Sequence, residues 1–444
     1  MKTENGKLKK YKLGEYIDSF GDGIHGTPNY DEKGEYYFIN GNNLKDGQLN
    51  ITEDTLKISS NEYSKIKRRL IPNNTILVSI NGTLGNVALY KSENIALGKS
   101  ACYLNLKDSS FRFFLRYLLK TKEFKNYMNR VAGQSTIKNV SPTQISEYEF
   151  FAPPLESQKK IAAVLSSLDD KIALNNRINA KLEQMAKRLY EHWFVQFDFP
   201  VSCHSELVSE SHSDEMLNQV QHDECAKPYK STGGKMVWNE ELKREIPEGW
   251  EVKKLGEILI LLKDGTHNPP KRQEKGIPLL TGTMFGNNFL DYDKATYISE
   301  ADYKIIHSQY EPHENDVIIT KIGTLGNVNL LRNIDIPVAI HCNSALLRFD
   351  MALGVYYPFS YCKSDLFKMR LKAIKGQSIQ EFASLDRISS IKSEVPCVDI
   401  INKFDKIVKP IIEKQKSISF ENKKLKEMRD KLLPLLMNGQ VVVK

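Results

Sequence analysis

The chain has 444 residues, a formal net charge of +8 at pH 7 and six cysteines. This length allows two to four domains that each bury a core, and the positive charge suits a polyanionic partner. Because it has no Cys-x-x-Cys pair, no apolar N-terminal stretch and no run of 18 apolar residues, we expect a soluble, cytoplasmic protein without disulfides or a membrane span.

Residues 1–152 are expected to form a compact domain of mixed helices and strands. Four short runs are rich in β-branched and aromatic residues and are bounded by Gly, Asn or Pro, a pattern that predicts strands. These runs are Tyr36–Ile39, Thr75–Ile80, Asn86–Tyr90 and Cys102–Leu106. The following stretch, Arg112–Met128, is rich in Phe, Leu, Tyr and Lys and is expected to be helical.

Residues 153–200 are expected to form a long helix. Pro153 and Pro154 interrupt the preceding pattern, and proline is tolerated in the first helical turn. Apolar residues then recur at alternating spacings of four and three, which is typical of a coiled-coil seam. They are Ile161, Leu165, Leu168, Ile172, Leu182, Met185, Leu189 and Trp193. A helix of about 38 residues would be roughly 57 Å long.

Residues 201–240 are interpreted as an inserted linker. Val201–Ala226 contains six acidic residues and no lysine or arginine, so the rest of the chain carries a charge of +14. Its polar composition is typical of a solvated linker and compatible with disorder. The alternative is a zinc site, although the spacing of the possible ligands matches no common site. Those ligands would be Cys203, His204, His212, His222 and Cys225.

The second half of the chain repeats the first. Four short sequence motifs (words) recur after a shift of 241–243 residues. This repeat predicts a second mixed domain over residues 241–396. Leu13–Glu15 returns as Leu255–Glu257, Asp22–His25 as Asp264–His267, Gly82–Val87 as Gly323–Val328 and Gly133–Ser135 as Gly376–Ser378. The residues between these words differ. Two similar halves imply approximate two-fold symmetry, which suits the backbone of duplex DNA.

Residues 397–444 are expected to form a second long helix. Its apolar stripe consists of Phe404, Val408, Ile411, Ile418, Leu425, Met428, Leu432 and Leu436. Asn179 and Asn422 interrupt the two stripes at positions 243 residues apart. A polar residue on a seam can fix the register of two helices at some cost in stability. The alternative is that both asparagines face solvent at the edge of the stripe.

Two motifs resemble parts of enzyme active sites, but each lacks a residue that the site requires. Asn268–Lys271 resembles the Asn-Pro-Pro-aromatic loop of amino-group DNA methyltransferases, but a lysine replaces the aromatic residue and no Gly-rich cofactor loop is present. Gly98–Ser100 resembles the end of a phosphate-binding loop, but Glu93 stands where that loop needs glycine. We expect no catalytic residues and no metal site.

The Gly-Thr-Leu-Gly-Asn word follows a strong strand pattern in each half. It is interpreted first as a tight hairpin in which glycine supplies positive φ. The functional alternative is that its polar side chains lie beside a nucleic-acid backbone. Basic residues also cluster in both halves, either as solvated surface or as phosphate contacts.

Together these observations give a set of candidate DNA-binding residues, in which cations contact phosphates and neutral polar side chains after glycine read base edges. The set consists of Lys65, Lys67, Arg68, Arg69, Thr83, Asn86, Gln134, Ser135, Thr136, Lys138, Lys263, His267, Lys271, Arg272, Lys321, Thr324, Asn327, Lys375, Gln377 and Ser378.

The order of these words resembles type I restriction-modification specificity subunits over nearly the whole chain outside the insert. Ile246–Val252 with Leu255–Glu257 is similar to the start of a target recognition domain of that family. Pro153–Ala162, Leu168–Ile172 and Leu189–Phe194 resemble its central helix, and Leu432–Gly439 resembles the end of its distal helix.

The resemblance implies an α+β fold, with two target recognition domains separated by two long antiparallel coiled-coil helices. It also implies a non-catalytic subunit that reads a bipartite, asymmetric DNA target and assembles with two methyltransferase subunits and with restriction subunits. S-adenosylmethionine, ATP and Mg²⁺ would then be held by the partners and no cofactor by this chain. The competing interpretations are a stand-alone DNA methyltransferase or nuclease and a purely structural coiled-coil scaffold.

Overall fold

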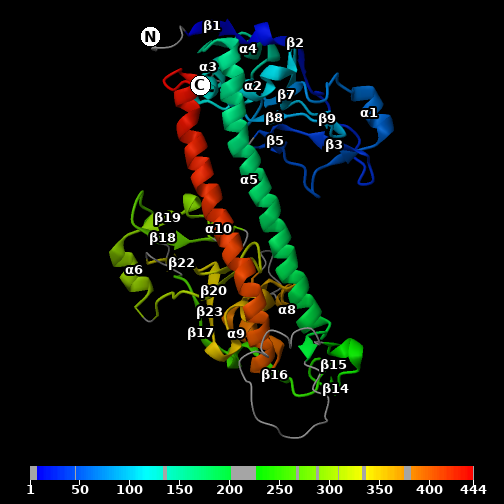
Figure 1. Ribbon diagram of the computed structural model, residues 1–444, viewed down its shortest axis with the longest axis vertical. Coiled ribbons are helices and arrows are strands. Elements are labelled where there is room, and N and C mark those ends of the chain that lie inside the picture. The colour runs from blue at the N-terminus through cyan, green and yellow to red at the C-terminus, as the bar shows by residue number, and fades with distance from the viewer. Residues whose placement is uncertain are drawn as a thin grey trace, which may run out of the picture. The chain divides into compact units, whose positions relative to one another are not determined.

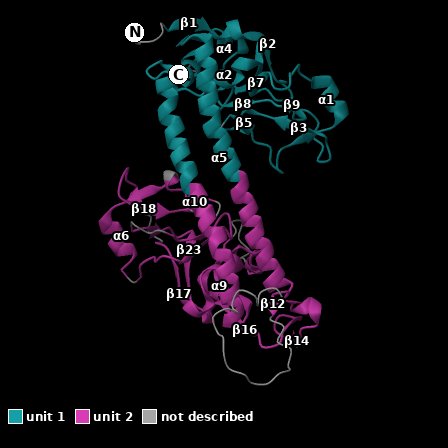
Figure 2. Ribbon diagram, viewed as in Figure 1, with its two compact units in different colours: residues 1–176, 420–444 teal, residues 177–419 magenta. Residues whose placement is uncertain are grey.

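The computed structural model describes residues 8–45, 47–133, 138–201, 227–266, 270–286, 290–308, 310–332, 337–374 and 382–443. The chain divides into two compact units, shown in different colours in Figure 2. Unit 1 consists of residues 1–176 and 420–444, and unit 2 of residues 177–419. Each unit contains one mixed domain and a part of both long helices (Figure 1).

The domain of unit 1 is built on a four-stranded antiparallel sheet in the order β2-β10-β7-β8. The strands are β2 (Ile17–Asp22), β10 (Ala101–Leu106), β7 (Thr75–Ser79) and β8 (Val87–Leu89). Every residue of β7 is buried, as expected for a continuous apolar run that is covered on both faces. The four predicted strand runs are all confirmed, within one or two residues at their ends.

Smaller sheets and short helices complete this domain. The three-stranded sheet β6-β3-β9 contains Lys57–Ile58, Tyr36–Ile39 and Ile95–Leu97, and the two-stranded sheets are β1 (Lys9–Lys12) with β11 (Glu149–Ala152) and β4 (Leu44–Lys45) with β5 (Gln48–Leu49). The helices are α1 (Ser60–Ile66), α2 (Arg112–Leu118), α3 (Lys122–Val131) and α4 (Pro142–Ser146).

The helical stretch predicted over Arg112–Met128 is confirmed, and it consists of two separate helices, α2 and α3. Thr121 begins α3 as its N-cap, and its hydroxyl accepts a hydrogen bond from the backbone N–H of Phe124 at 3.3 Å. A capping hydroxyl satisfies an N–H that has no partner within the helix, and so it favours a new helix start at this position.

The domain of unit 2 repeats the main sheet, the three-stranded sheet and the outer strand pair, and a single bridge between Phe285 and Leu290 stands in the place of β4 and β5. Its four-stranded sheet has the order β17-β23-β20-β21, its three-stranded sheet the order β19-β18-β22, and β16 pairs with β24. The strands are β16 (Glu251–Lys254), β17 (Leu259–Asp264), β18 (Ile277–Leu280), β19 (Thr296–Ile298), β20 (Val317–Thr320), β21 (Val328–Leu330), β22 (Ala339–Ile340), β23 (Ser344–Phe349) and β24 (Lys392–Val395). Its helices are α6 (Glu300–Ile306), α7 (Tyr356–Lys363), α8 (Asp365–Ala373) and α9 (Leu385–Ser389).

Unit 2 also contains strands that precede its repeat. The short pair β12 (Pro200–Val201) and β13 (Lys227–Pro228) is followed by a hairpin of β14 (Met236–Asn239) and β15 (Arg244–Pro247). The described part of the predicted linker 201–240 is therefore folded, since β13 and β14 lie within it. The five possible zinc ligands lie outside the described residues, and no group of three potential metal ligands occurs within them.

The two long helices are α5 (Leu155–Tyr190) and α10 (Val398–Met437), and they lie side by side and antiparallel in each unit (Figure 1). In unit 1, Arg429 Nη1 lies 2.8 Å from Asp169 Oδ1, and Asn175 bonds to Asn422. In unit 2, Asn179 bonds to Ser419, whereas the rings of Tyr190 and Phe404 lie 6.2 Å apart. Residue numbers thus rise along one helix and fall along the other. The predicted α+β fold with antiparallel long helices is confirmed.

The predicted seam of these helices is largely buried. Ile161, Leu165, Ile172, Phe404, Val408, Ile418 and Asn422 are buried, and Leu168, Asn179, Leu182, Leu189, Ile411, Leu425 and Leu432 are half-buried. The seam prediction is wrong for Met185 and Met428, which are 55% and 50% exposed. Each methionine follows a seam residue by three positions where the alternation of three and four requires four, so Ala186 and Arg429 take the seam positions instead, at 8% and 16% exposed.

The asparagines near the middle of the helices form the same contact in both units. In unit 1 the Asn422 amide donates to Asn176 Oδ1 at 2.9 Å, and in unit 2 the Asn179 amide donates to Ser419 Oγ at 3.4 Å. The repeat relates these two pairs, because both partners are shifted by 243 residues. Asn422 is only 8% exposed, so the solvent-facing alternative is wrong for this residue. Both contacts favour one register of the helices.

No helix in the described part of the chain is both long enough and apolar enough to cross a lipid bilayer.

Candidate nucleic-acid interface

In each unit, loops that are distant in sequence meet at one edge of the main sheet. In unit 1, Ile24 forms a bridge with Gly98, and Asn81 forms one with Asn139. We call residues 22–25, 80–86, 98–100 and 138–140 the loop edge of unit 1. The equivalent bridges in unit 2 join Thr266 to His341 and Ile322 to Phe382, so that its loop edge consists of residues 264–266, 321–327, 341–343 and 382–383.

The Gly-Thr-Leu-Gly-Asn word forms a hairpin that a hydroxyl closes. In unit 1, Ser79 Oγ donates to the carbonyl of Thr83 and accepts from the backbone N–H of Asn86 at 2.8 Å. Gly82 and Gly85 have φ values of +71° and +76°, which favour glycine. The interpretation of this word as a hairpin is confirmed. The closing hydroxyl lies before the repeated word and was missed by the sequence analysis.

The same hairpin in unit 2 is closed by Thr320, whose hydroxyl donates to the carbonyl of Thr324 and accepts from the backbone N–H of Asn327 at 2.9 Å. Thr83 and Thr324 at the tips are exposed, and so is Asn327, whereas Asn86 is half-buried. Each loop therefore presents a threonine hydroxyl to solvent on a fixed backbone.

The repeated Asp-Gly word positions a second loop by close backbone approach. A Cβ atom on Gly23 would lie 2.2 Å from the carbonyl oxygen of Gly98, and one on Gly265 would lie 1.8 Å from that of Ile340. Only glycine lets this turn pack against the neighbouring strand without a shift of the backbone. The glycine of this word thus has a structural reason, and it fixes the aspartate beside it.

Several charged groups at or near the unit 1 loop edge form hydrogen bonds or ion pairs within the domain. Arg68 Nε donates to the carbonyl of Asp22 at 2.9 Å, and His25 Nε2 lies 2.8 Å from Asp22 Oδ2. Lys65 pairs with Glu62 on α1 at 3.0 Å. Lys138 Nζ donates to Asn129 Oδ1 at 3.2 Å and is exposed. The structure thus places Arg68 and Lys138 at the loop edge, and Lys65 on α1. Lys67 and Arg69 are also exposed.

In unit 2 the loop edge borders a cavity of about 510 Å³. Its lining consists of Arg272, Thr281, Gly282, Thr283, Thr296, Thr320, Ile322, Thr324, His341 and Asn343. The polar side chains among them supply hydroxyls, an amide, an imidazole and one cation. Burial, and then the charge of Arg272, lower the pKa of His341 below its ordinary value, so this ring is neutral at pH 7. Neutral donors and acceptors beside one cation suit both base edges and a phosphate.

Lys321 is a correction to the candidate set. Its ammonium lies 2.9 Å from Asp264 Oδ2 and 5.5 Å from the centre of the Phe382 ring, and its side chain is 3% exposed. An ammonium can be buried when it is paired in this way. Lys321 therefore supports the loop edge from within the fold, and its ammonium is not exposed at the surface.

The remaining candidates divide between exposed positions and undescribed ones. Lys271 and Arg272 are exposed, whereas Lys263 on β17 is half-buried. Seven candidates lie outside the described residues, namely Gln134, Ser135, Thr136, His267, Lys375, Gln377 and Ser378. His341 and Asn343 were missed by the sequence analysis, because their repeat counterparts are Gly98 and Ser100 and no shared word marks them.

The comparisons with known proteins agree with this architecture. Residues 5–184 match the family described as "Type I restriction modification DNA specificity domain". The MjaIX specificity subunit of a type I restriction enzyme of Methanocaldococcus jannaschii is 29% identical over 413 residues, which cover 89% of this chain and 83% of that protein. The HindI specificity subunit of Haemophilus influenzae is 27% identical over 360 residues, which cover 74% of this chain and 77% of that protein.

Among solved structures, the crystal structure of the type I restriction-modification S subunit from M. genitalium covers 98% of this chain and 98% of its own. The TM-score is 0.54 and the sequence identity 21%, so this comparison shows a shared fold.

Proposed function

The chain belongs to the family of type I restriction-modification specificity subunits, and from this premise we propose that each of its two mixed domains reads one half of a bipartite DNA target. The observation that carries the proposal is the repeated loop edge. Both units share one framework of sheet, Asp-Gly turn and hydroxyl-closed hairpin, yet they present different side chains on it. A conserved scaffold with different surfaces suits two different half-sites.

Each loop edge, together with the side chains that border it, contains the two kinds of group that DNA recognition requires. Exposed cations, such as Lys138 in unit 1 and Arg272 in unit 2, can contact phosphates and set the register. Exposed hydroxyl and amide groups, such as Thr83, Thr324 and Asn327, can read base edges. The net charge of +8 favours association with DNA at both edges.

The two long helices are proposed to act as a spacer. α5 is a continuous helix of 36 residues and α10 one of 40 residues. At 1.5 Å per residue they are roughly 54 and 60 Å long, which exceeds the roughly 34 Å between half-sites one turn of B-DNA apart. The asparagine contacts between the helices favour one register, so the spacer would have a defined length.

The catalytic groups are proposed to lie on partner subunits. Two methyltransferase subunits would bind the helices and domains and supply S-adenosylmethionine chemistry on adenine. Restriction subunits would supply ATP- and Mg²⁺-dependent cleavage. This chain would hold none of these cofactors itself, and its part would be to bring the partners to the target.

We expect the double substitution Lys271→Ala and Arg272→Ala to weaken binding of the purified chain to duplex DNA. Loss of one or two phosphate contacts should reduce the slope of log K against log salt by about 1 to 2. The slope can be measured by fluorescence anisotropy between 50 and 200 mM salt. Lys243→Ala, an exposed lysine that pairs with Glu240, is the matched control and should leave the slope unchanged.

An unchanged slope in the double variant, with the fold intact by circular dichroism, would contradict the assignment of this loop edge to DNA. Saturable binding of S-adenosylmethionine by the chain alone would instead favour a stand-alone methyltransferase.

A further inference from the structure

The internal repeat identifies a surface in unit 1 that is open where its counterpart in unit 2 is covered. Strands β11 and β24 are equivalent, because each pairs with the strand that begins its domain. On this alignment Phe151 corresponds to Glu394, and Glu149 corresponds to Lys392. Glu394 is 5% exposed, whereas Phe151 is 63% exposed. The same position of the same strand is therefore buried in one unit and open in the other.

In unit 2 the β14–β15 hairpin covers this position of the strand. Arg244 of β15 lies 3.5 Å from Glu394 Oε1, and its guanidinium lies over the ring of Phe197 at 4.6 Å. Glu241, in the turn of the hairpin, lies 3.1 Å from the ammonium of Lys392. Arg370 of α8 also holds this carboxylate, at 2.8 and 2.9 Å, and Arg244, with the ring of Phe197 beside it, is the group that the hairpin adds to cover this face.

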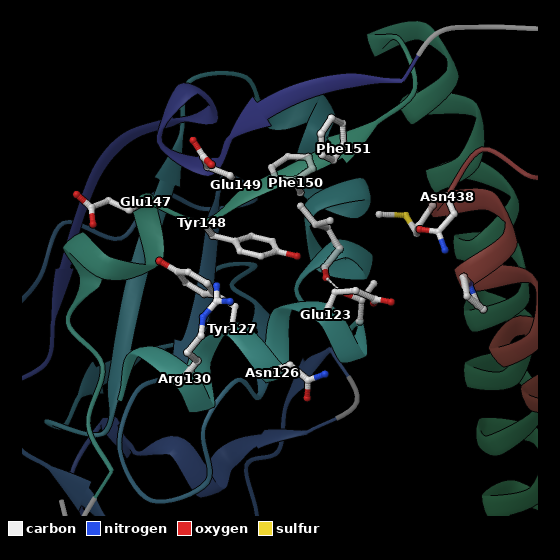
Figure 3. A pocket seen from close by; sticks show the side chains of 14 residues that line it. Glu123, Asn126, Tyr127, Arg130, Glu147, Tyr148, Glu149, Phe150, Phe151 and Asn438 are labelled. Atoms are coloured by element: carbon white, nitrogen blue, oxygen red, sulfur yellow. Dashed lines mark hydrogen bonds between the residues drawn. The ribbon is translucent and has the colours of Figure 1, made fainter. Parts of the chain in front are cut away.

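In unit 1 the equivalent face contains a cavity of about 610 Å³, which we call the β11 cavity (Figure 3). It lies between β11, α3 and the end of α10, and Figure 3 shows Tyr148, Phe150 and Glu123 across from Asn438. Its lining is Leu118, Thr121, Glu123, Asn126, Tyr127, Arg130, Glu147, Tyr148, Glu149, Phe150, Phe151, Pro434, Met437 and Asn438. The size is that of a site which can receive side chains of a partner.

The chemistry of the β11 cavity indicates what it would bind. Its aromatic groups include Phe151, which is exposed on the outward face of the strand. Its charged groups are Glu123, Glu147 and Glu149 against Arg130, and Glu149 also pairs with Lys10 at 2.7 Å. The acidic excess favours a cation, and the rings favour an apolar group or a guanidinium stacked on them.

We propose that the β11 cavity receives a polypeptide segment of a methyltransferase subunit that carries an arginine or lysine beside an apolar side chain. The segment would occupy in unit 1 the place that Arg244 and its hairpin occupy in unit 2. This inference rests on the proposed function, because it takes the methyltransferase as the partner. An exposed aromatic residue in a recess is typical of the centre of a protein interface, and the acidic groups around it suit a polar rim that pairs with a cation.

The test is a titration of the full chain with its methyltransferase subunit, followed by mass photometry of the complexes. The variant Phe151→Asp should weaken one of the two binding steps by at least about 10-fold, as for loss of a central aromatic contact. The charge-reversal variant Glu123→Lys with Glu147→Lys should slow association, and more so at low salt than at high salt. Ile260→Asp, on a strand of unit 2 and 62% exposed, is the matched control and should bind like wild type.

A second experiment locates the partner directly. The variant Phe151→p-benzoylphenylalanine carries a photo-cross-linker at this position. Irradiation of the full complex should cross-link the chain to a methyltransferase peptide that contains a lysine or arginine. Cross-linking to another copy of this chain would overturn the inference, and so would unchanged binding of both the Phe151 and the charge-reversal variants. Failure of the wild-type chain to bind the methyltransferase at all would instead contradict the proposed function.

Discussion

Replacing Asp169 by alanine is expected to lower the free energy of unfolding of unit 1 by about 3–5 kcal/mol. Asp169 lies on α5, and its side chain is 11% exposed. Its carboxylate accepts hydrogen bonds from Arg116 at 2.6 Å and Tyr117 at 2.7 Å, both on α2, and from Arg429 of α10 at 2.8 Å. One carboxylate thus joins the domain to both long helices. Its removal leaves the buried guanidinium of Arg116 without its counter-charge.

The neighbouring residue supplies the control for this prediction. Asp170 is exposed on the same helix, so Asp170→Ala should change the free energy of unfolding by less than about 0.5 kcal/mol. Both values can be obtained from urea denaturation followed by circular dichroism. Equal effects of the two substitutions would contradict the importance of this cluster.

The stabilisation by Asp169 should depend on pH. Burial opposes ionisation of this carboxyl, but the hydrogen bonds from Arg429 and Tyr117 and the charges of Arg116 and Arg429 outweigh burial and lower its pKa. A carboxyl with a lowered pKa in the folded state contributes stability that is fully present above its unfolded pKa, about 3.9. That contribution is lost as the pH falls through the folded pKa. The difference between wild type and Asp169→Ala should therefore shrink in acid.

Replacing Glu394 by alanine is expected to destabilise unit 2 by a similar amount, about 3–5 kcal/mol. Its carboxylate accepts two hydrogen bonds from Arg370 of α8, at 2.8 and 2.9 Å, and lies 3.5 Å from Arg244 of the hairpin. Its side chain is 4% exposed. Without it, the two guanidinium groups would face each other across a site with little water.

The hairpin should respond first to the loss of Glu394. We expect faster amide hydrogen exchange over β14 and β15 in Glu394→Ala than in wild type, measured by mass spectrometry. Glu245→Ala, an exposed carboxylate on β15, serves as the control and should leave exchange unchanged. Protection of the hairpin in Glu394→Ala equal to that of wild type would show that the ion pairs do not hold the cover in place.

Much of the fold follows from patterns that can be read along the chain. The strands around Thr75–Ser79 and Val317–Thr320 are predictable because burial on both faces requires continuous apolar runs. The long helices are predictable from their spacing of apolar residues. Met185 and Met428 are exposed because they break the alternation of four and three by one residue, so apolar character alone does not place a residue on the seam.

The site was predictable in outline only. The repeated words mark the Asp-Gly turn and the hairpin, because both need glycine at fixed places. Lys321 could not be assigned from sequence, since its partner Asp264 lies 57 residues earlier and only the folded sheet brings them together. His341 and Asn343 line the unit 2 cavity because β22 pairs with β18 in the folded domain and the turn after β22 follows from that pairing. No local sequence pattern predicts this pairing.

The central claim is that the two long helices set the distance between the half-sites. Lengthening both helices is the most direct test of it. Seven residues would be inserted into α5 after Asn176 and seven into α10 after Ser419, so that about two helical turns are added to each helix while the seam keeps its phase. The added length of roughly 10.5 Å corresponds to about three base pairs of B-DNA.

The measurement is the position of methylated adenines in DNA from cells that express the lengthened chain with its methyltransferase partner, read by long-read sequencing. We expect the bases of both half-sites to stay the same and the gap between them to increase by about three base pairs. Methylation at the original spacing, or at half-sites with different bases, would contradict the spacer and with it the function proposed for this chain.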